Sequence, residues 1–84
     1  MTELQARIIA SIAEVLGVPR AKVTPDAYLI EDLGADSLDA VELGLLLEEE
    51  YHIPLDDEVI LALITVQDLI NVVEQLSAQA EQEE

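Results

Sequence analysis

Apolar residues recur every three to four positions along three stretches of this 84-residue chain, which is the spacing of an amphipathic helix. The first stretch runs from Leu4 to Leu16. Thr2 precedes it as a potential N-terminal cap, with Glu3 in the first turn, and Gly17 follows it as a potential left-handed residue at the C-terminal end. We therefore predict a helix between Thr2 and Gly17.

A second helix is predicted from residue 37 to about 51, with Asp36 as its cap and Asp39 completing a capping box. A step of about 100° per residue separates its apolar positions into two sides. The side expected to face the core carries Ala40, Leu43, Leu47 and Tyr51, and the other side carries Leu38, Val41 and Leu45 among Glu42, Glu48 and Glu49. Gly44 costs roughly 1 kcal/mol relative to Ala in mid-helix, and we expect it to permit close helix packing.

Two more helices are predicted in the last third of the chain. A short one covers about residues 58–62, with Asp56 or Asp57 as its cap, and the last begins after Thr65. Asp68 completes a second capping box there. The buried stripe of this last helix is expected to be Val66, Leu69, Ile70, Val73 and Leu76. Residues 77–84 are small, polar and acidic, so we expect a disordered tail after a domain of residues 1–76.

A long connection, residues 20–35, joins the first two helices and has a turn signal at Thr24-Pro25-Asp26. Connections of this length are usually packed or functional. Four apolar residues are expected to hold it against the helices: Val23, Leu29, Ile30 and Leu33. Because no segment alternates like a strand, we predict an all-α fold, a small four-helix bundle with three longer helices and a short third one.

Charge narrows the possible partners. The net charge is −16, and the basic residues Arg7, Arg20 and Lys22 precede all but two of the 19 acids. Such a chain disfavours nucleic acid and anionic membranes and favours basic protein partners. The alternative is that the acids serve only solubility.

Several site chemistries are excluded by what the sequence lacks. There is no Cys, and hence no disulfide, thiolate metal site or cysteine nucleophile. Ser37 and His52 lie fifteen residues apart on one predicted helix, roughly 22 Å, too far for a nucleophile and its base. No calcium-loop spacing or Gly-rich phosphate loop is present. We therefore expect neither an enzyme nor a metal site.

No secretory signal or membrane span is visible in the sequence. The longest apolar run, Val59 to Ile64, is far shorter than the roughly 20 residues that a membrane-spanning helix needs. The expected location is therefore the cytoplasm, or an organelle derived from bacteria, without membrane insertion.

Ser37 occupies the first position of the second predicted helix. The unpaired N–H groups and the dipole at a helix N-terminus favour an anion, so a serine there is well placed to carry a phosphate ester. The alternative is that Ser37 is an ordinary capping residue.

The residues around Ser37 resemble a known segment. The run Glu31-Asp32-Leu33-Gly34-Ala35-Asp36-Ser37-Leu38-Asp39-Ala40-Val41-Glu42-Leu43 resembles the attachment segment of acyl carrier proteins. The similarity extends from about Ile8 to Val73. It implies the carrier fold, a 4′-phosphopantetheine esterified to Ser37, and acyl groups held as thioesters on the sulfur of that arm.

The resemblance also implies partners. A phosphopantetheinyl transferase would attach the arm from coenzyme A, and acyl-chain synthases, reductases and acyltransferases with basic docking patches would use the carrier, which is expected to be a monomer. Together with the outward side of the second helix, it predicts docking at Asp36, Leu38, Asp39, Val41, Glu42, Leu45, Glu48 and Glu49. Fatty acid biosynthesis is the expected pathway. The alternatives are a specialised carrier for polyketide, peptide or lipid-modification chemistry, and an acidic adaptor that carries nothing.

One segment departs from the family pattern. Common carriers place several acids in the third helix, whereas Val59 to Ile64 here is uncharged. The simpler expectation is that Ile60, Leu63 and Ile64 are buried while Val59 or Leu61 is partly exposed. The alternative is that this segment reshapes the site between the second and third helices, which shelters the acyl chain in the family, or forms a docking patch.

Overall fold

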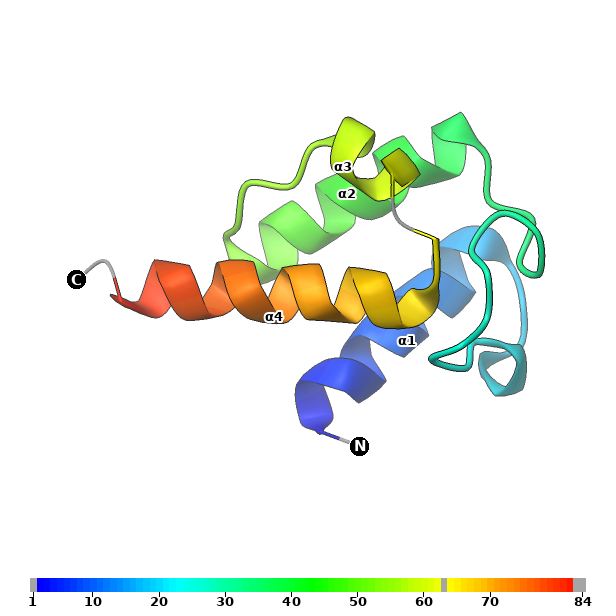
Figure 1. The fold of residues 1–84 in the computed structure, drawn as a ribbon, viewed down its shortest axis with the longest axis horizontal. Helices are drawn as coiled ribbons and strands as arrows, with labels where there is room; N and C mark the ends of the chain where they lie inside the picture. The colour runs from blue at the N-terminus through cyan, green and yellow to red at the C-terminus, as the bar shows by residue number, and fades with distance from the viewer. Residues whose placement is uncertain (1, 63, 83–84) are drawn as a thin grey trace.

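Four α-helices and one turn of 3₁₀ helix make up the secondary structure of residues 2–62 and 64–82, the part of the chain that the computed structural model describes. In chain order they are α1 (Glu3–Leu16), η1 (Arg20–Lys22), α2 (Ser37–Tyr51), α3 (Asp57–Ala62) and α4 (Val66–Gln82) (Figure 1). The predicted all-α bundle with a short third helix is confirmed.

Local capping signals set where the helices begin and end. Thr2 caps α1, and its hydroxyl accepts a hydrogen bond from the Gln5 N–H at 3.1 Å while the Gln5 side chain accepts one from the Thr2 N–H. Gly17 ends the helix with φ at 68°, in the left-handed region that glycine adopts without strain. Thr65 and Asp68 form the capping box expected before α4.

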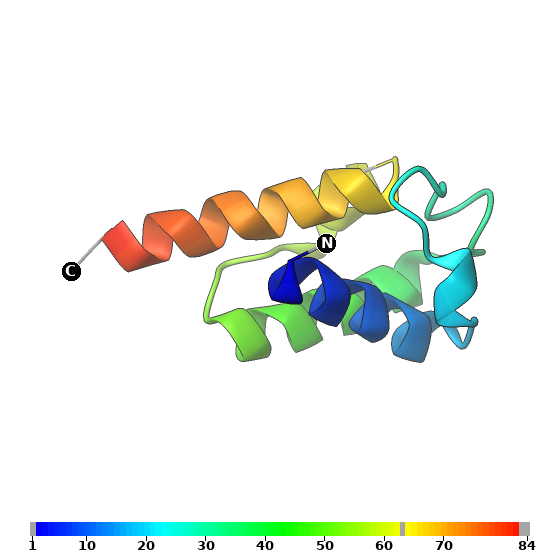
Figure 2. The same cartoon turned by 90° about the horizontal axis from the view of Figure 1, so that it is seen from below.

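The core is aliphatic and receives side chains from every helix. In Figures 1 and 2, α4 lies across one side of the molecule, and α1 and α2 lie on the other side. The most deeply buried large side chains are Ile8, Ile12, Leu47, Leu55, Leu69, Ile70, Val66 and Val73. Ser11 is also buried, and its hydroxyl donates to the Arg7 carbonyl at 3.0 Å. Burial of these aliphatic faces supplies the main driving force for the fold.

The connection between α1 and α2 is packed, as predicted, but one of its expected anchors is wrong. Val23, Leu29 and Leu33 are buried, whereas 55% of Ile30 is exposed. Leu29 and Leu33 lie four residues apart on one side of a tight turn, and this turn directs Ile30 outward. Ala27 is buried instead, an anchor that the sequence pattern did not indicate.

This connection pairs with the start of α4 (Figure 2). Tyr28 and Thr65 form an isolated antiparallel bridge. The Leu29 N–H donates to the Ile64 carbonyl, and the Val66 N–H donates to the Ala27 carbonyl, both at 3.0 Å. The long connection is therefore fixed by backbone hydrogen bonds as well as by apolar packing.

The α3 segment is held to α2 at Gly44. A Cβ atom added to Gly44 would lie 3.1 Å from Ile60 Cδ1 and 3.3 Å from the Leu55 carbonyl oxygen. Both contacts are tight, so the expectation that Gly44 permits close packing is confirmed.

Within the apolar run of α3, Ile60 is buried while Val59 and Leu61 are exposed. The expected burial of Ile64 is wrong, since 61% of it is exposed. The Ile64 backbone is engaged on both sides, with its carbonyl accepting from Leu29 and its N–H donating to Asp68, and its side chain stays outside. Leu63 lies outside the described residues.

Helix α4 is longer than predicted. It continues to Gln82, so residues 77–82 are helical where the sequence predicted a disordered tail. Gln, Ala and Glu, which dominate this segment, are good helix formers, so the helix continues past Leu76, the last residue of the predicted stripe. The last two residues of the expected tail lie outside the described part of the chain, and the domain boundary at residue 76 stays a prediction.

Candidate functional site

The approach to α2 is a turn whose end is fixed by hydrogen bonds. Gly34 has φ at 74°, and a Cβ there would meet no atom within 4 Å, so the conformation rather than space calls for glycine. The Gly34 N–H donates to the Ile30 carbonyl at 3.0 Å, and the Ala35 N–H donates to the Leu29 carbonyl at 2.9 Å. This turn brings the chain to Asp36 in an extended conformation, which starts the helix.

Asp36 and Asp39 form the predicted capping box. The Asp36 carboxylate accepts from the Asp39 N–H at 2.9 Å, and the Asp39 carboxylate accepts from the Asp36 N–H at 3.1 Å. The box places Ser37 as the first residue of α2. Both carboxylates are therefore engaged with backbone N–H groups beside Ser37.

Ser37 is exposed at the N-terminus of α2, and its hydroxyl makes no hydrogen bond to another described residue. The backbone N–H groups of Ser37 and Leu38 are at the positive end of the helix and have no partner one turn earlier within it. A phosphodiester on this hydroxyl would meet open space and helix N–H groups. The geometry thus fits a phosphate-linked prosthetic group.

The chain has two other serines, and both are less accessible. Ser11 is buried and donates to a carbonyl in α1. The Ser77 hydroxyl is buried without a hydrogen-bond partner among the described residues. Exposure therefore separates Ser37 from the other two hydroxyls of its kind.

A small apolar cavity lies beside the start of α2. Its volume is about 20 Å³, roughly the space of one water molecule. Its lining comes from α1, the connection, α2 and α3: Leu16, Leu29, Ile30, Ala35, Asp36, Asp39, Ala40, Leu43, Ile60 and Leu61. This cavity lies between the second and third helices, where the resemblance implied a shelter for an acyl chain.

The predicted docking residues lie together along α2. Leu38, Val41 and Leu45 are exposed by 71%, 38% and 58%. Glu42 and Glu49 are exposed, and Glu48 is half-buried beside a shallow groove that also includes Val41, Leu45, Leu55 and Asp56. The outward orientation predicted for this side of α2 is confirmed, while its use in docking stays a prediction.

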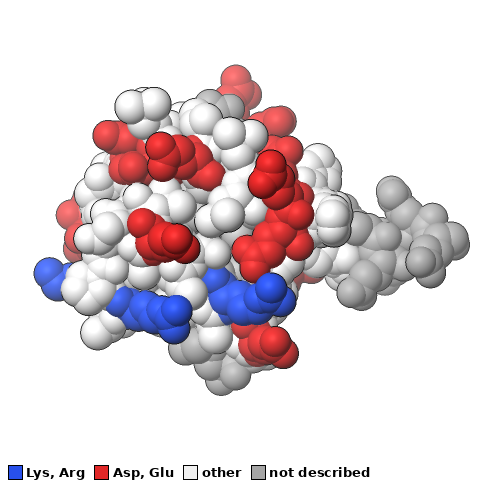
Figure 3. Space-filling model, turned by 180° about the vertical axis from the view of Figure 1, so that it is seen from behind, with Lys and Arg blue, Asp and Glu red and all other residues white. Residues whose placement is uncertain are grey.

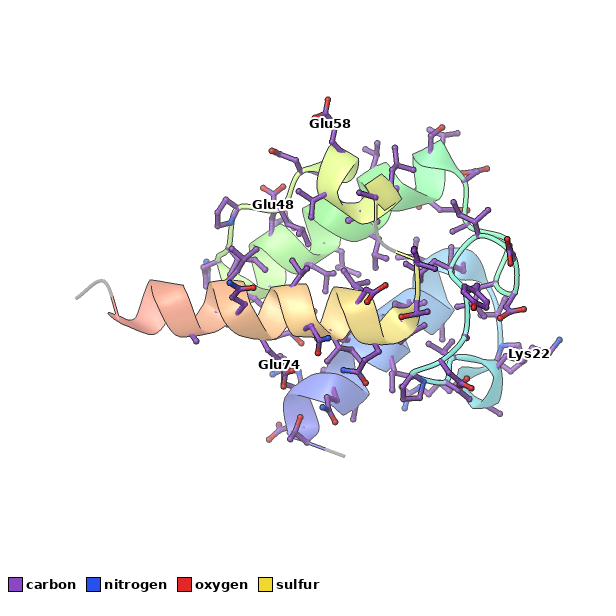
Figure 4. The ribbon with its side chains drawn as sticks, viewed as in Figure 1. Lys22, Glu48, Glu58 and Glu74 are labelled. Atoms are coloured by element: carbon purple, nitrogen blue, oxygen red, sulfur yellow. The ribbon has the colours of Figure 1, made fainter. Side chains whose placement is uncertain are left out.

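Charge is distributed unevenly over the surface. Figure 3 shows acidic side chains over the upper part of the face formed by α1 and α2, and the basic side chains in a band across its lower half, with acidic atoms also below the band on the right. In Figure 4, Glu48 and Glu58 lie on the side of α2 and α3, and Lys22 projects from the far end near η1. Glu48 and Glu58 therefore lie on a different part of the surface from Lys22.

The opposite end of α2 is tied to α1. Arg7 Nη2 lies 3.0 Å from Glu50 Oε1, and its guanidinium lies 6.0 Å from the centre of the Tyr51 ring. Burial and the Glu50 carboxylate raise the pKa of the Tyr51 hydroxyl, against the opposing effect of Arg7. His52 follows Tyr51, is exposed and has φ at 55°. Because Ser37 is the first residue of α2, the length of the helix separates His52 from it.

Among the described residues, no cluster of three or more His, Cys, Asp or Glu side chains could hold a metal ion. No helix in that part of the chain is both long and apolar enough to cross a membrane.

Sequence reasoning did not identify one apolar surface close to this site. Tyr28, Ile30, Leu61 and Ile64 are exposed together, although they come from segments far apart in the sequence. The only sequence signal for this surface is the apolar run at the end of the third helix. The bridge between Tyr28 and Thr65 places Tyr28 and Ile30 beside the end of that run.

Comparison with known proteins agrees with this geometry. Residues 6–73 match the family described as "Phosphopantetheine attachment site", whose members carry covalently attached 4′-phosphopantetheine and act as carriers rather than as enzymes. The structure is similar to the solution structure of the apo doublet acyl carrier protein from prodigiosin biosynthesis, with a TM-score of 0.74 and 23% sequence identity. That alignment covers 86% of this chain and 35% of the other, so the chain spans about a third of the length of that protein.

A match over most of the chain, an exposed serine at the start of α2 and the acyl carrier fold lead to one conclusion. The chain belongs to the phosphopantetheine attachment site family and is an acyl carrier-type domain of that family.

Proposed function

We propose that this protein carries acyl groups as thioesters on a 4′-phosphopantetheine arm esterified to Ser37. The observation that supports this most strongly is the exposed Ser37 hydroxyl at the first position of α2, within the residues that match the family. The arm, when bound, supplies the thiol that the chain lacks, since the sequence contains no Cys.

The residues around Ser37 would each contribute to attachment. Asp36 and Asp39 hold the first turn of α2, so the backbone of Ser37 is fixed where an incoming transferase would meet its hydroxyl. The N–H groups of that turn would stabilise the negative charge of the phosphodiester. The transferase would supply the general base and the Mg²⁺.

We propose partner docking along α2. Exposed Leu38, Val41 and Leu45, with Glu42 and Glu49 among them, form a small apolar surface with an acidic rim. Such a surface suits a brief encounter with an enzyme that presents basic residues around an apolar centre. Carriers of this family interact with phosphopantetheinyl transferases and with biosynthetic enzymes, and the same surface would serve both.

Fatty acid biosynthesis is the pathway that we propose first, with the protein acting as a cytoplasmic monomer. A net charge of −16 would oppose self-association. A specialised carrier is the second candidate, because the exposed Val59 and Leu61 make α3 more apolar than the family pattern. The fold similarity to a carrier from prodigiosin biosynthesis is compatible with both.

Incubation with coenzyme A, Mg²⁺ and a phosphopantetheinyl transferase of broad specificity tests the carrier role. Intact-mass spectrometry should find the mass of one phosphopantetheinyl group added to each chain. Loading of the product with an acyl group by an acyl-activating enzyme should then give a hydroxylamine-sensitive thioester. A folded protein that gains no mass would contradict the proposal and favour the acidic adaptor.

A further inference from the structure

An open apolar groove runs along the outside of the bundle, between the connection and the junction of α3 with α4. It has a volume of about 360 Å³ and is lined by Tyr28, Ile30, Glu31, Leu61, Ala62 and Ile64. Large apolar side chains in it remain exposed: 44% of Tyr28, 55% of Ile30, 42% of Leu61 and 61% of Ile64. Clustered and exposed apolar side chains of this kind indicate a binding surface.

Backbone hydrogen bonds hold the two walls of this groove together. Tyr28 forms the antiparallel bridge with Thr65, and the Leu29 N–H donates to the Ile64 carbonyl at 3.0 Å. Figure 2 shows the connection reaching the start of α4 at this point. The groove is therefore preformed, as ligand sites usually are.

The groove adjoins the small cavity beside Ser37. Ile30 and Leu61 line both spaces, so these two side chains form the partition between them. The cavity, next to Asp36 and Asp39, is the more enclosed of the two and has room for about one water molecule, whereas the groove outside the partition is open to solvent. An apolar group near Ser37 would therefore find an accessible apolar surface on the outer side of Ile30 and Leu61.

We propose that this outer groove receives the distal part of the acyl chain carried on Ser37. The inference rests on the proposed function and adds a binding site to it, separate from the interior site between α2 and α3. A hydrocarbon chain has no polar groups to satisfy, which matches walls made by Tyr28, Ile30, Leu61 and Ile64. Because the cargo is tethered to the same molecule, its effective concentration at the groove is high.

Charge argues against a second copy of the chain as the occupant. Each copy has a net charge of −16, and Glu31 lies at the groove itself, so two copies would repel each other. A patch built from four large apolar side chains is also smaller than a stable protein interface. A tethered chain avoids both difficulties.

The test begins with isotope-labelled protein loaded by a phosphopantetheinyl transferase from butyryl- or dodecanoyl-coenzyme A. Nuclear Overhauser contacts between the chain methylenes and the side chains of Tyr28, Ile30 and Ile64 are expected for the dodecanoyl form and not for the butyryl form. Contacts confined to Ala40, Leu43 and Ile60 inside the bundle, or no contacts at all, would overturn the proposal that the chain binds in the groove.

Two matched variants add a second measurement. Ile64→Ser removes an apolar wall of the groove, and Val59→Ser removes an exposed aliphatic side chain of α3 that does not line the groove. If the chain binds in the groove, the dodecanoyl form should melt at a higher temperature than the butyryl form, and Ile64→Ser should reduce that difference by roughly half or more. Val59→Ser should leave it unchanged.

Equal differences in wild type and both variants would overturn the proposal, and melting of the unloaded proteins controls for the fold. Failure to gain acyl mass would instead refute the proposed function itself, and the groove with it. An acylated protein whose chain does not contact the groove would refute the groove alone.

Discussion

Asp36 and Asp39 cap each other's backbone at the start of α2, with the two carboxylates accepting from the partner's N–H at 2.9 and 3.1 Å. Ser37 lies between them in the sequence. Their reciprocal hydrogen bonds fix the turn that presents the serine. The carboxylates of Asp36 and Asp39 therefore stabilise the start of α2. An experiment on docking has to separate this capping from a direct contact with a partner.

Replacing the cap is expected to weaken the fold by a modest amount. Asp36→Ala should lower the free energy of unfolding by about 1 kcal/mol, because the Asp39 N–H loses its partner. Asp36→Asn keeps an acceptor oxygen and should stay close to wild type. Urea unfolding measures both, and equal losses in the two variants would show that charge rather than capping is responsible.

The loss of stability at acidic pH should depend in part on Asp68. Backbone N–H groups of Thr65 and Ile64 lower the pKa of this carboxyl from its usual value near 3.8. Because the pKa is lower in the folded state, ionised Asp68 stabilises the fold above the unfolded pKa, and this stabilisation is lost as the pH falls through the folded value.

Asp68→Asn should therefore melt at a lower temperature than wild type near neutral pH, with the gap closing below about pH 5. Melting temperatures across this range check it, and Glu49→Gln, at an exposed site on α2, controls for the removal of one charge. A gap that stays constant with pH would contradict the account.

Added salt should raise the stability of the protein. The net charge of −16 causes repulsion within the folded state, and screening relieves it. The one Arg–Glu pair formed among the described residues, between Arg7 and Glu50, is partly exposed and contributes at most about 1 kcal/mol, so its weakening is a smaller effect. Melting temperatures at rising NaCl concentration should increase, and a flat or falling series would refute this.

Docking along α2 should depend on its acids. Glu42→Lys is expected to reduce the association rate with a basic phosphopantetheinyl transferase, because it reverses charge on the face that surrounds Val41 and Leu45. Glu14→Lys, at an exposed site on α1, changes the net charge equally and is the matched control. Stopped-flow binding at low and moderate salt measures both, and equal slowing by the two variants would argue for net charge alone.

The close packing at Gly44 should couple the effects of substitutions in α2 and α3 on the free energy of unfolding. Gly44→Val is expected to lower the free energy of unfolding by about 1–3 kcal/mol, because an added Cβ would lie 3.1 Å from Ile60 Cδ1. Ile60→Val removes that Cδ1 atom, so the double variant should lose less than the sum of the two single losses. A double-mutant cycle by urea unfolding measures the coupling, and strict additivity would contradict the contact.

Helix ends were predictable where the signal is local. Thr2, Gly17 and the pairs Asp36/Asp39 and Thr65/Asp68 act over a single turn, and the structure confirms their capping. The exposed side of α2 was also predictable, because helical periodicity alone separates Leu38 and Leu45 from the core.

Features that depend on contacts between distant segments were not predictable. The bridge between Tyr28 and Thr65 directs Ile64 outward, and the turn after Tyr28 does the same for Ile30, although both are aliphatic residues in apolar stretches. The end of α4 was predicted too early because the small, polar and acidic composition of residues 77–84 suits a disordered segment as well as a helix. The groove near Ser37 was not predicted either, because its walls come from two segments that are distant in the sequence.

The central claim is that Ser37 carries the arm, and comparison of Ser37 with Ser77 tests it most directly. Wild type, Ser37→Ala and Ser77→Ala would each be incubated with coenzyme A, Mg²⁺ and a phosphopantetheinyl transferase, and their intact masses measured. Wild type and Ser77→Ala should gain one phosphopantetheinyl group, while Ser37→Ala stays folded by circular dichroism and gains none. A phosphopantetheinyl group on folded Ser37→Ala would contradict the assignment.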